Sequence, residues 1–117
     1  MNCAYNAVSA LGRANYGTIA QHPGTRQVLR LVVEETVAVA HASGVRIPDI
    51  DVVDAVFNFG DAMSEATSST AQDIVRGKRT EIDSLNGYVA RRGAELSVAT
   101  PVNQTLYALV KLLEEVK

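Results

Sequence analysis

Apolar side chains recur at intervals of three and four residues along most of the chain, the spacing that places them on one face of a helix. The clearest segment is 101–116, where Pro101 takes the first helical position after Thr100 as the N-cap. Its stripe consists of Val102, Leu106, Leu109, Leu113 and Val116. A second long helix is predicted over 25–43, and Gly44 is expected to end it. Its stripe consists of Val28, Leu31, Val32, Glu35 and Val39, widened by Val33, Val37 and Ala40.

The segments around these two helices are shorter. The segment 2–15 is apolar from its first residues and has no capping residue, so we expect it to continue a helix that begins upstream of Met1. Gly and Pro interrupt 17–24, which is predicted to be a loop with one turn at most. After a linker that contains Pro48, either Asp49 or Asp51 caps a helix running to about Thr67. Its buried side is predicted to be Val52, Val53, Val56, Phe57, Phe59 and Met63.

Two capping patterns define the remaining helices. Ser69 with Gln72 and Thr70 with Asp73 have the capping-box spacing, which predicts a short helix that ends before Gly77. Thr80 with Asp83 repeats that spacing and starts a helix whose core-facing residues are Ile82, Leu85, Val89 and Leu96. Gly87 within it predicts close packing against a neighbouring backbone, since glycine costs about 1 kcal/mol relative to alanine there. The pattern therefore predicts an all-α fold, a compact bundle of about six helices forming one domain over 1–117.

Composition narrows the function classes. The 117 residues include 47% hydrophobic and 21% charged residues, which is typical of one globular domain. A net charge of −2 argues against nucleic acid as a partner, and no apolar run is long enough to cross a membrane. The single cysteine and the absence of a signal peptide at the N-terminus favour a cytoplasmic protein. No glycine-rich dinucleotide or nucleotide fingerprint occurs, so this chain does not bind a dinucleotide by that route.

Four polar residues stand out as candidates for chemistry, each with a structural alternative. Asn2 and Asn6 lie four apart on one helix face and either present two amides to a ligand or bond to neighbouring helices. Glu81 either interacts favourably with a helix dipole or tunes a nearby acid. Ser69 is either an N-cap or a hydroxyl that binds a substrate carboxylate.

Other reactive side chains favour structural roles. Cys3 is interpreted as a small buried side chain, and no metal site is expected because His22 and His41 share no ligand spacing. Asp61 and Glu65, four apart on one predicted helix, are interpreted as a surface pair. The basic residues Arg76, Lys78 and Arg79 are typical of a solvated loop, with contact to a cofactor phosphate from another domain as the alternative.

Three motifs together resemble the C-terminal domain of ketopantoate reductases (2-dehydropantoate 2-reductases). They are S-S-x-x-Q-D at 68–73, G-[KR]-R-T-E-I-D-x-[LI]-N-G at 77–87 and T-P-x-N at 100–103. The start of the chain is similar to the family's N-x-x-x-N-x-[LV]-[ST]-A-L helix, at 2–11. The resemblance implies the helical domain of a reductase with the 6-phosphogluconate-dehydrogenase-like architecture. It also implies an N-terminal Rossmann domain outside this chain, which would bind most of NADPH.

The resemblance implies reduction of a 2-keto acid by hydride transfer from NADPH, with a proton delivered to the developing alkoxide. The family's acid is a lysine four residues before the first asparagine, three residues upstream of Met1 here, so the isolated chain is expected to be inactive. Asn2, Asn6 and Ser69 would bind the substrate. Glu81 would lie near the lysine and the cofactor and support catalysis.

This sequence departs from the family at two positions. Tyr16 precedes Gly17 where the family often has asparagine, with Asn15 one residue earlier, and Thr70 replaces the usual methionine. A close 2-keto acid could therefore replace ketopantoate as the substrate. The alternative to an enzyme domain is a non-enzymatic helical module for interaction or dimerisation, and a homodimer is also a candidate assembly for the reductase.

Overall fold

The computed structural model describes residues 2–46 and 51–116, except for the side chain of Asn2. The predicted all-α fold is confirmed: these residues form seven α-helices and one 3-10 turn, and no strand occurs among them. In chain order, the elements are α1 (Asn2–Gly12), α2 (Tyr16–Gln21), α3 (Pro23–Ala42), α4 (Val52–Ala62), α5 (Ser69–Val75), η1 (Ile82–Ser84), α6 (Asn86–Glu95) and α7 (Pro101–Val116).

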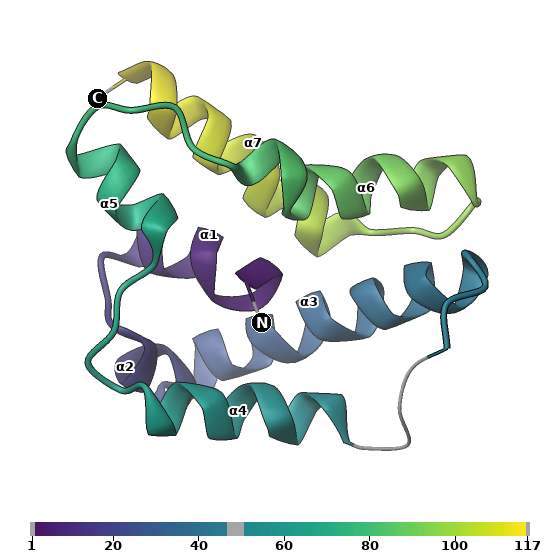
Figure 1. Cartoon of the computed structure of the whole chain (residues 1–117), viewed down its shortest axis with the longest axis horizontal. Coiled ribbons are helices and arrows are strands. Elements are labelled where there is room, and N and C mark those ends of the chain that lie inside the picture. Colours follow the sequence, from purple (N-terminus) through teal and green to yellow (C-terminus); the bar gives the residue numbers. More distant parts are fainter. Residues whose placement is uncertain (1, 47–50, 117) are drawn as a thin grey trace.

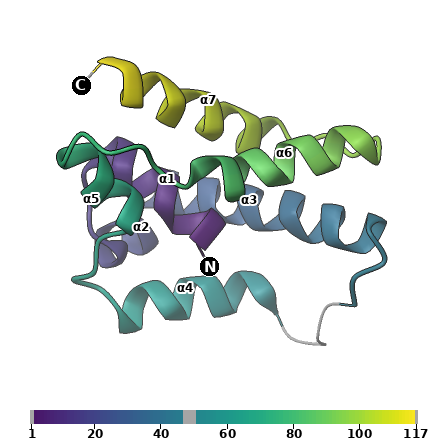
Figure 2. The same cartoon turned by 45° about the horizontal axis from the view of Figure 1, so that its top comes forward.

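Helix α1 is the centre of the bundle. It lies between a layer of α3 and α4 and a layer of α6 and α7, and α5 packs across it (Figures 1 and 2). Its apolar face is almost completely buried, so the other helices pack around this element. The largest apolar side chains with almost no exposure are Tyr5, Ile19, Leu29, Ile82, Val32 and Val110.

The region between α1 and α3 differs from the prediction. Helix α1 ends at Gly12 rather than near Asn15, because the Asn15 side chain accepts a hydrogen bond from Thr18 N at 3.0 Å and caps the new helix α2. The predicted loop at 17–24 is therefore mostly helical. His22 then caps α3, its Nδ1 accepting from Gly24 N at 3.2 Å and Thr25 N at 3.3 Å, so α3 begins at Pro23.

Helix α4 begins as predicted but ends earlier. Asp51 is the N-cap and accepts from Asp54 N at 3.1 Å, whereas Pro48 and Asp49 lie outside the described residues. The helix stops at Ala62 instead of about Thr67, and the backbone that follows pairs with α2 through Gly17 N to Ser64 O at 2.9 Å. Met63, predicted to be buried, is 49% exposed as a result.

Both predicted capping boxes are shifted. The N-cap of α5 is Ser68, which accepts from Ala71 N at 3.0 Å, rather than Ser69 or Thr70. The next segment is only the turn η1, and its N-cap is Glu81 rather than the predicted Thr80, with no capping hydrogen bond from the Glu81 side chain. The Thr80 hydroxyl accepts from Ile82 N at 3.3 Å. The continuous helix begins at Asn86.

The glycine prediction is confirmed in part. A Cβ on Gly87 would lie 2.7 Å from Tyr107 Cε1 and 3.1 Å from Ile82 O, so the close neighbour is mainly an aromatic ring rather than backbone. Gly44 ends α3 with a positive φ of 81°, as predicted.

The predicted stripe of α7 is confirmed in part, since Leu106 is buried and Val102 and Leu113 are half-buried. Leu109 is 43% and Val116 64% exposed, whereas Asn103 and Val110, which the stripe did not include, are buried. At the start of the helix, Glu35 on α3 accepts hydrogen bonds from Val102 N and Asn103 N, both at 2.9 Å. Glu35 therefore takes the capping contacts that were predicted for the side chain of Thr100.

Candidate functional site

Asn6 is a buried amide in the middle of α1, 3% exposed. Its Nδ2 donates to Thr70 Oγ1 at 3.1 Å, which ties it to the first turn of α5. Its backbone carbonyl accepts from Ser9 Oγ at 3.2 Å and from Ser68 Oγ at 3.3 Å, and the two serine hydroxyls are 2.5 Å apart. The side-chain oxygen of Asn6 and the second N–H of its Nδ2 have no hydrogen-bond partner among the described residues, so both remain for a ligand.

Ser69 lies next to this network but points away from it. It is the first residue of α5 and is exposed, whereas its neighbours Ser68 and Thr70 are 2% and 1% exposed. Among the described residues, no hydrogen bond involves the Ser69 hydroxyl. The hydroxyl is therefore available to a ligand at the N-terminus of α5.

Glu81 is exposed, and its carboxylate forms no hydrogen bond or ion pair with the described part of the chain. Two residues of the same segment, Thr80 and Asp83, are tethered to α7. Thr80 donates to Glu114 Oε2 from its amide at 3.0 Å and also from its hydroxyl. Asp83 accepts from Tyr107 Oη at 2.6 Å and from Lys111 Nζ at 3.3 Å.

These tethers shift several pKa values. The hydrogen bond from Tyr107 lowers the pKa of Asp83, with further help from Lys111, and the same bond raises the pKa of Tyr107. Burial alone would raise the pKa of Glu114, but the hydrogen bonds from Thr80 and Lys111 outweigh it and lower the pKa. Lys111 has a raised pKa because it donates first to Glu114 and then to Asp83.

A second buried network connects the first turn of α1 to the C-terminal helices. Asn86 Nδ2 donates to Cys3 O at 3.0 Å and to Asn103 Oδ1 at 2.9 Å, and Asn103 Nδ2 donates to Glu35 Oε1 at 2.8 Å. Asn86 and Asn103 are both 0% exposed. The sequence assigned no role to these two amides, although both lie in the motifs at 77–87 and 100–103 and Glu35 is a charged residue within an otherwise apolar stripe.

The comparisons with known proteins decide the family. The model of "Ketopantoate reductase PanE/ApbA C terminal" matches residues 1–114. The chain belongs to the ketopantoate reductase family. It is 40% identical to the 2-dehydropantoate 2-reductase of Pyrobaculum aerophilum over 114 residues, which are 97% of this chain and 40% of that protein.

Solved structures of the family have the same fold. A PanE/ApbA family ketopantoate reductase from Ralstonia eutropha JMP134 aligns with a TM-score of 0.92 at 49% identity, covering 97% of this chain and 38% of that one. A dimeric ketopantoate reductase from Staphylococcus aureus aligns with a TM-score of 0.86 at 26% identity, covering 97% and 40%. This chain thus spans about two fifths of the length of these ketopantoate reductases.

The structure brings together some of the residues singled out from the family motifs. Asn6 and the start of α5, where Ser69 lies, are in direct contact through Thr70. The side chain of Asn2 lies outside the described part of the structure. Glu81 is linked to α1 only indirectly, through Asn86, which follows η1 and bonds to Cys3.

At the two departures from the family pattern, the side chains are engaged within the fold. Asn15 caps α2, and Tyr16 is 8% exposed and stacks on Tyr5 with ring centroids 4.5 Å apart. Thr70 is the hydrogen-bond acceptor for Asn6. At this place in the ketopantoate reductase fold, the oxygen of Asn15 is therefore used in capping, which leaves its Nδ2 unbonded within the described chain, and Tyr16 offers no amide.

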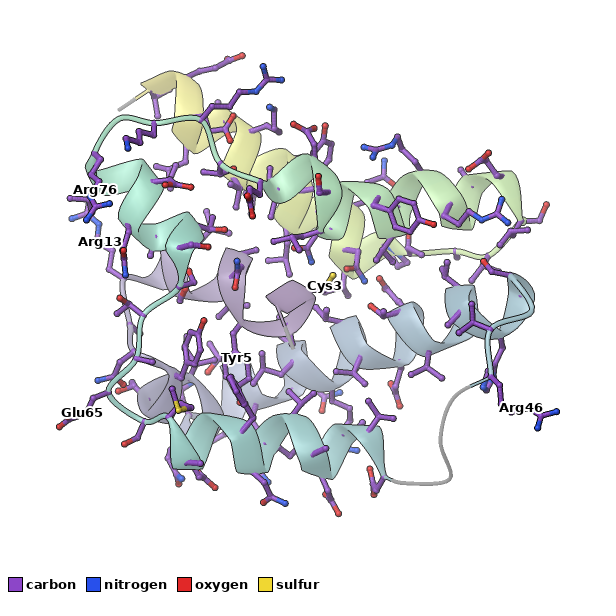
Figure 3. The ribbon with its side chains drawn as sticks, in the orientation of Figure 1. Cys3, Tyr5, Arg13, Arg46, Glu65 and Arg76 are labelled. Carbon is purple, nitrogen blue, oxygen red and sulfur yellow. The ribbon has the colours of Figure 1, made fainter. Side chains whose placement is uncertain are left out.

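The remaining candidates hold structural positions. Cys3, at the start of α1 (Figure 3), is half-buried rather than buried, and burial raises the pKa of its thiol. His22 Nδ1 is used in capping α3. Asp61 accepts from Gln21 Nε2 at 2.6 Å, and Glu65 lies beyond the end of α4, so the predicted pair does not share one helix. Within the described ranges, no group of three or more His, Cys, Asp or Glu side chains could hold a metal ion. No helix in the described part of the chain is long and apolar enough to cross a membrane.

Proposed function

We propose that this chain is the substrate-binding domain of a longer NADPH-dependent reductase. The reductase is a 2-dehydropantoate 2-reductase, which reduces ketopantoate to pantoate for pantothenate and coenzyme A biosynthesis, or an enzyme that reduces a close 2-keto acid. The observation that carries this proposal is the family match over residues 1–114. Support also comes from Ser69 and Glu81, motif residues whose exposed side chains form no hydrogen bond or ion pair within the described chain. A cytoplasmic location stays a prediction.

The proposed chemistry divides between this chain and the rest of the reductase. NADPH, held mainly by an N-terminal Rossmann domain, supplies the hydride when bound. The acid is a lysine upstream of Met1. On this chain, Asn2 and Asn6 bind the substrate and Ser69 donates its hydroxyl to it. The side-chain oxygen of Asn6, which has no partner within the described chain, accepts from a substrate hydroxyl, while one N–H of its Nδ2 donates to Thr70.

Glu81 of this chain is suited to support proton delivery next to the cofactor. The carboxylate of Glu81 is exposed and unpaired within the described chain, so it can approach a cationic acid or a cofactor hydroxyl held by another domain. An anionic group there would hold the lysine in its protonated form. We propose that Glu81 supports proton delivery in this way, and that the chain alone is inactive because the acid lies elsewhere.

Steady-state kinetics of the longer reductase test this proposal. We expect Glu81→Gln to lower kcat by about 10²–10⁴-fold, the range typical of a disturbed acid–base step. Ser69→Ala is expected mainly to raise the KM for ketopantoate, and Glu115→Gln, an exposed residue of α7, serves as the control. Unchanged kcat and KM in both site variants would contradict the assignment.

The outward face of α7 favours the second candidate, a helical module for interaction or a homodimer. Leu109, Leu112 and Val116 are 43%, 54% and 64% exposed and recur at helical spacing on this face. Sedimentation of the chain at increasing concentration tests self-association. A dimer that Leu112→Glu disrupts supports this candidate, and a monomer at every concentration contradicts it.

A further inference from the structure

The segment that carries Glu81 is held along the side of α7. Figures 1 and 2 both show the stretch between α5 and α6 running beside this helix. Thr80 donates to Glu114 through its amide at 3.0 Å and through its hydroxyl, so one carboxylate oxygen receives two hydrogen bonds. On the other side of Glu81, Asp83 Oδ1 accepts from Tyr107 Oη at 2.6 Å.

Three side chains of α7 form this attachment as a unit. Tyr107, Lys111 and Glu114 follow one another at steps of four and three residues, which places them on one helix face. Lys111 Nζ joins the two ends, because it lies 3.3 Å from Asp83 Oδ2 and 3.0 Å from Glu114 Oε1. We name Tyr107, Lys111 and Glu114 the α7 clamp.

The clamp determines where Glu81 stands because the Glu81 side chain forms no hydrogen bond or ion pair of its own within the described chain. Its place is set by the backbone of its neighbours, namely Thr80, which is held by Glu114, and Ile82, which is 0% exposed. A functional side chain on a short non-helical segment needs such support to keep a productive geometry.

We propose that Tyr107, Lys111 and Glu114 are positioning residues that fix Glu81 in its working orientation without touching the substrate. This inference rests on the proposed function. The proposed chemistry gives no role to Thr80 and Asp83, the two motif residues on either side of Glu81 and Ile82. The inference gives them one. Both are the points at which the clamp holds the segment.

Kinetics of the longer reductase test the catalytic part. Glu114→Ala is expected to lower kcat by about 10–100-fold, as small misplacements of catalytic groups do, with little change in the KM for ketopantoate. Glu114→Gln keeps one acceptor oxygen for the two Thr80 donors and is expected to retain most of the activity. Glu115→Ala, one residue further along α7 and exposed, is the matched control.

A double variant separates positioning from general stability. If the clamp acts through Glu81, adding Glu114→Ala to Glu81→Gln lowers kcat no further, and the pH profile of kcat shifts in the same direction in both single variants. Additive losses, or a single variant with reduced thermal stability and an unchanged kcat and pH profile, would overturn the proposal.

Amide hydrogen exchange of the 117-residue chain tests the clamp without any activity. In Glu114→Ala the amides of Thr80 and Ile82 are expected to exchange at least about ten-fold faster than in Glu115→Ala, while those in the middle of α1 keep their rates. Equal rates in the two variants would overturn the clamp itself. A longer protein that reduces no 2-keto acid would instead overturn the proposed function, and with it the catalytic part of this inference.

Discussion

Replacing Glu35 with alanine removes the acceptor at which α3 holds the start of α7. The carboxylate receives Val102 N, Asn103 N and Asn103 Nδ2 at 2.9, 2.9 and 2.8 Å. The first two are amides at the N-terminus of α7, which have no partner within the helix. The third belongs to a side chain that is 0% exposed and that also holds Asn86.

The expected loss in the free energy of unfolding follows from these contacts. Losing an N-terminal cap costs about 0.5–2 kcal/mol, and a buried donor left without a partner costs about 1–3 kcal/mol. Val32 O, 3.4 Å from Asn103 Nδ2, replaces part of the lost acceptor. We therefore expect Glu35→Ala to lose about 2–4 kcal/mol. A domain of this size has about 6–18 kcal/mol in total, so the variant stays folded.

Urea unfolding followed by circular dichroism measures this loss, and thermal unfolding should show a Tm lower by about 10 °C. Glu34→Ala changes the neighbouring exposed residue of α3 and is the matched control. Glu35→Gln, which keeps one acceptor oxygen, should fall between the two. If Glu35→Ala and Glu34→Ala unfold at the same denaturant concentration, the argument that Glu35 caps α7 is refuted.

Two further predictions concern packing and pH. Gly60→Ala should lower the free energy of unfolding measured in urea by about 1–3 kcal/mol, because the added Cβ would lie 2.1 Å from Tyr5 Oη. Gly12→Ala is the control and should not destabilise the chain, because its Cβ would meet nothing within 4 Å. The pKa values of Asp83 and Glu114 in the folded chain lie below their ordinary values of 3.8 and 4.5. The two carboxylates therefore contribute fully to the free energy of unfolding above pH 4.5, and this contribution is lost as the pH falls through the lowered pKa values. Urea midpoints measured from neutral to acidic pH should therefore drop more in the unsubstituted chain than in Glu114→Ala, and parallel curves would contradict this.

The fold class could be predicted from the sequence because helical periodicity is a local property. The long helix α3, the cap Asp51 and the stop at Gly44 depend on neighbouring residues only, and the structure confirms them. The helix α2 and the early end of α4 could not be predicted, since they depend on hydrogen bonds between segments far apart in the chain, such as Gly17 N to Ser64 O.

The candidate site was predictable only where a motif carries it. Ser69 and Glu81 follow from the family resemblance, and their roles stay predictions. The site is held together by contacts between residues far apart in the sequence. These contacts join Glu114 to Thr80, Asn86 to Cys3 and Glu35 to Val102. A local sequence pattern does not predict which residues form such a contact. The motifs contain Asn86 and Asn103, and Glu35 is a charge within an apolar stripe, but none of these signals identifies the partner.

The central claim, that this chain is the substrate half of a 2-dehydropantoate 2-reductase, is tested most directly by a chimera. In it, this chain replaces the matching 114-residue part of the Pyrobaculum aerophilum enzyme, which is 40% identical. We predict that the chimera oxidises NADPH when ketopantoate is added, and that Glu81→Gln in the chimera suppresses the reaction. A folded chimera that binds NADPH but leaves it unoxidised in the presence of ketopantoate would contradict the claim.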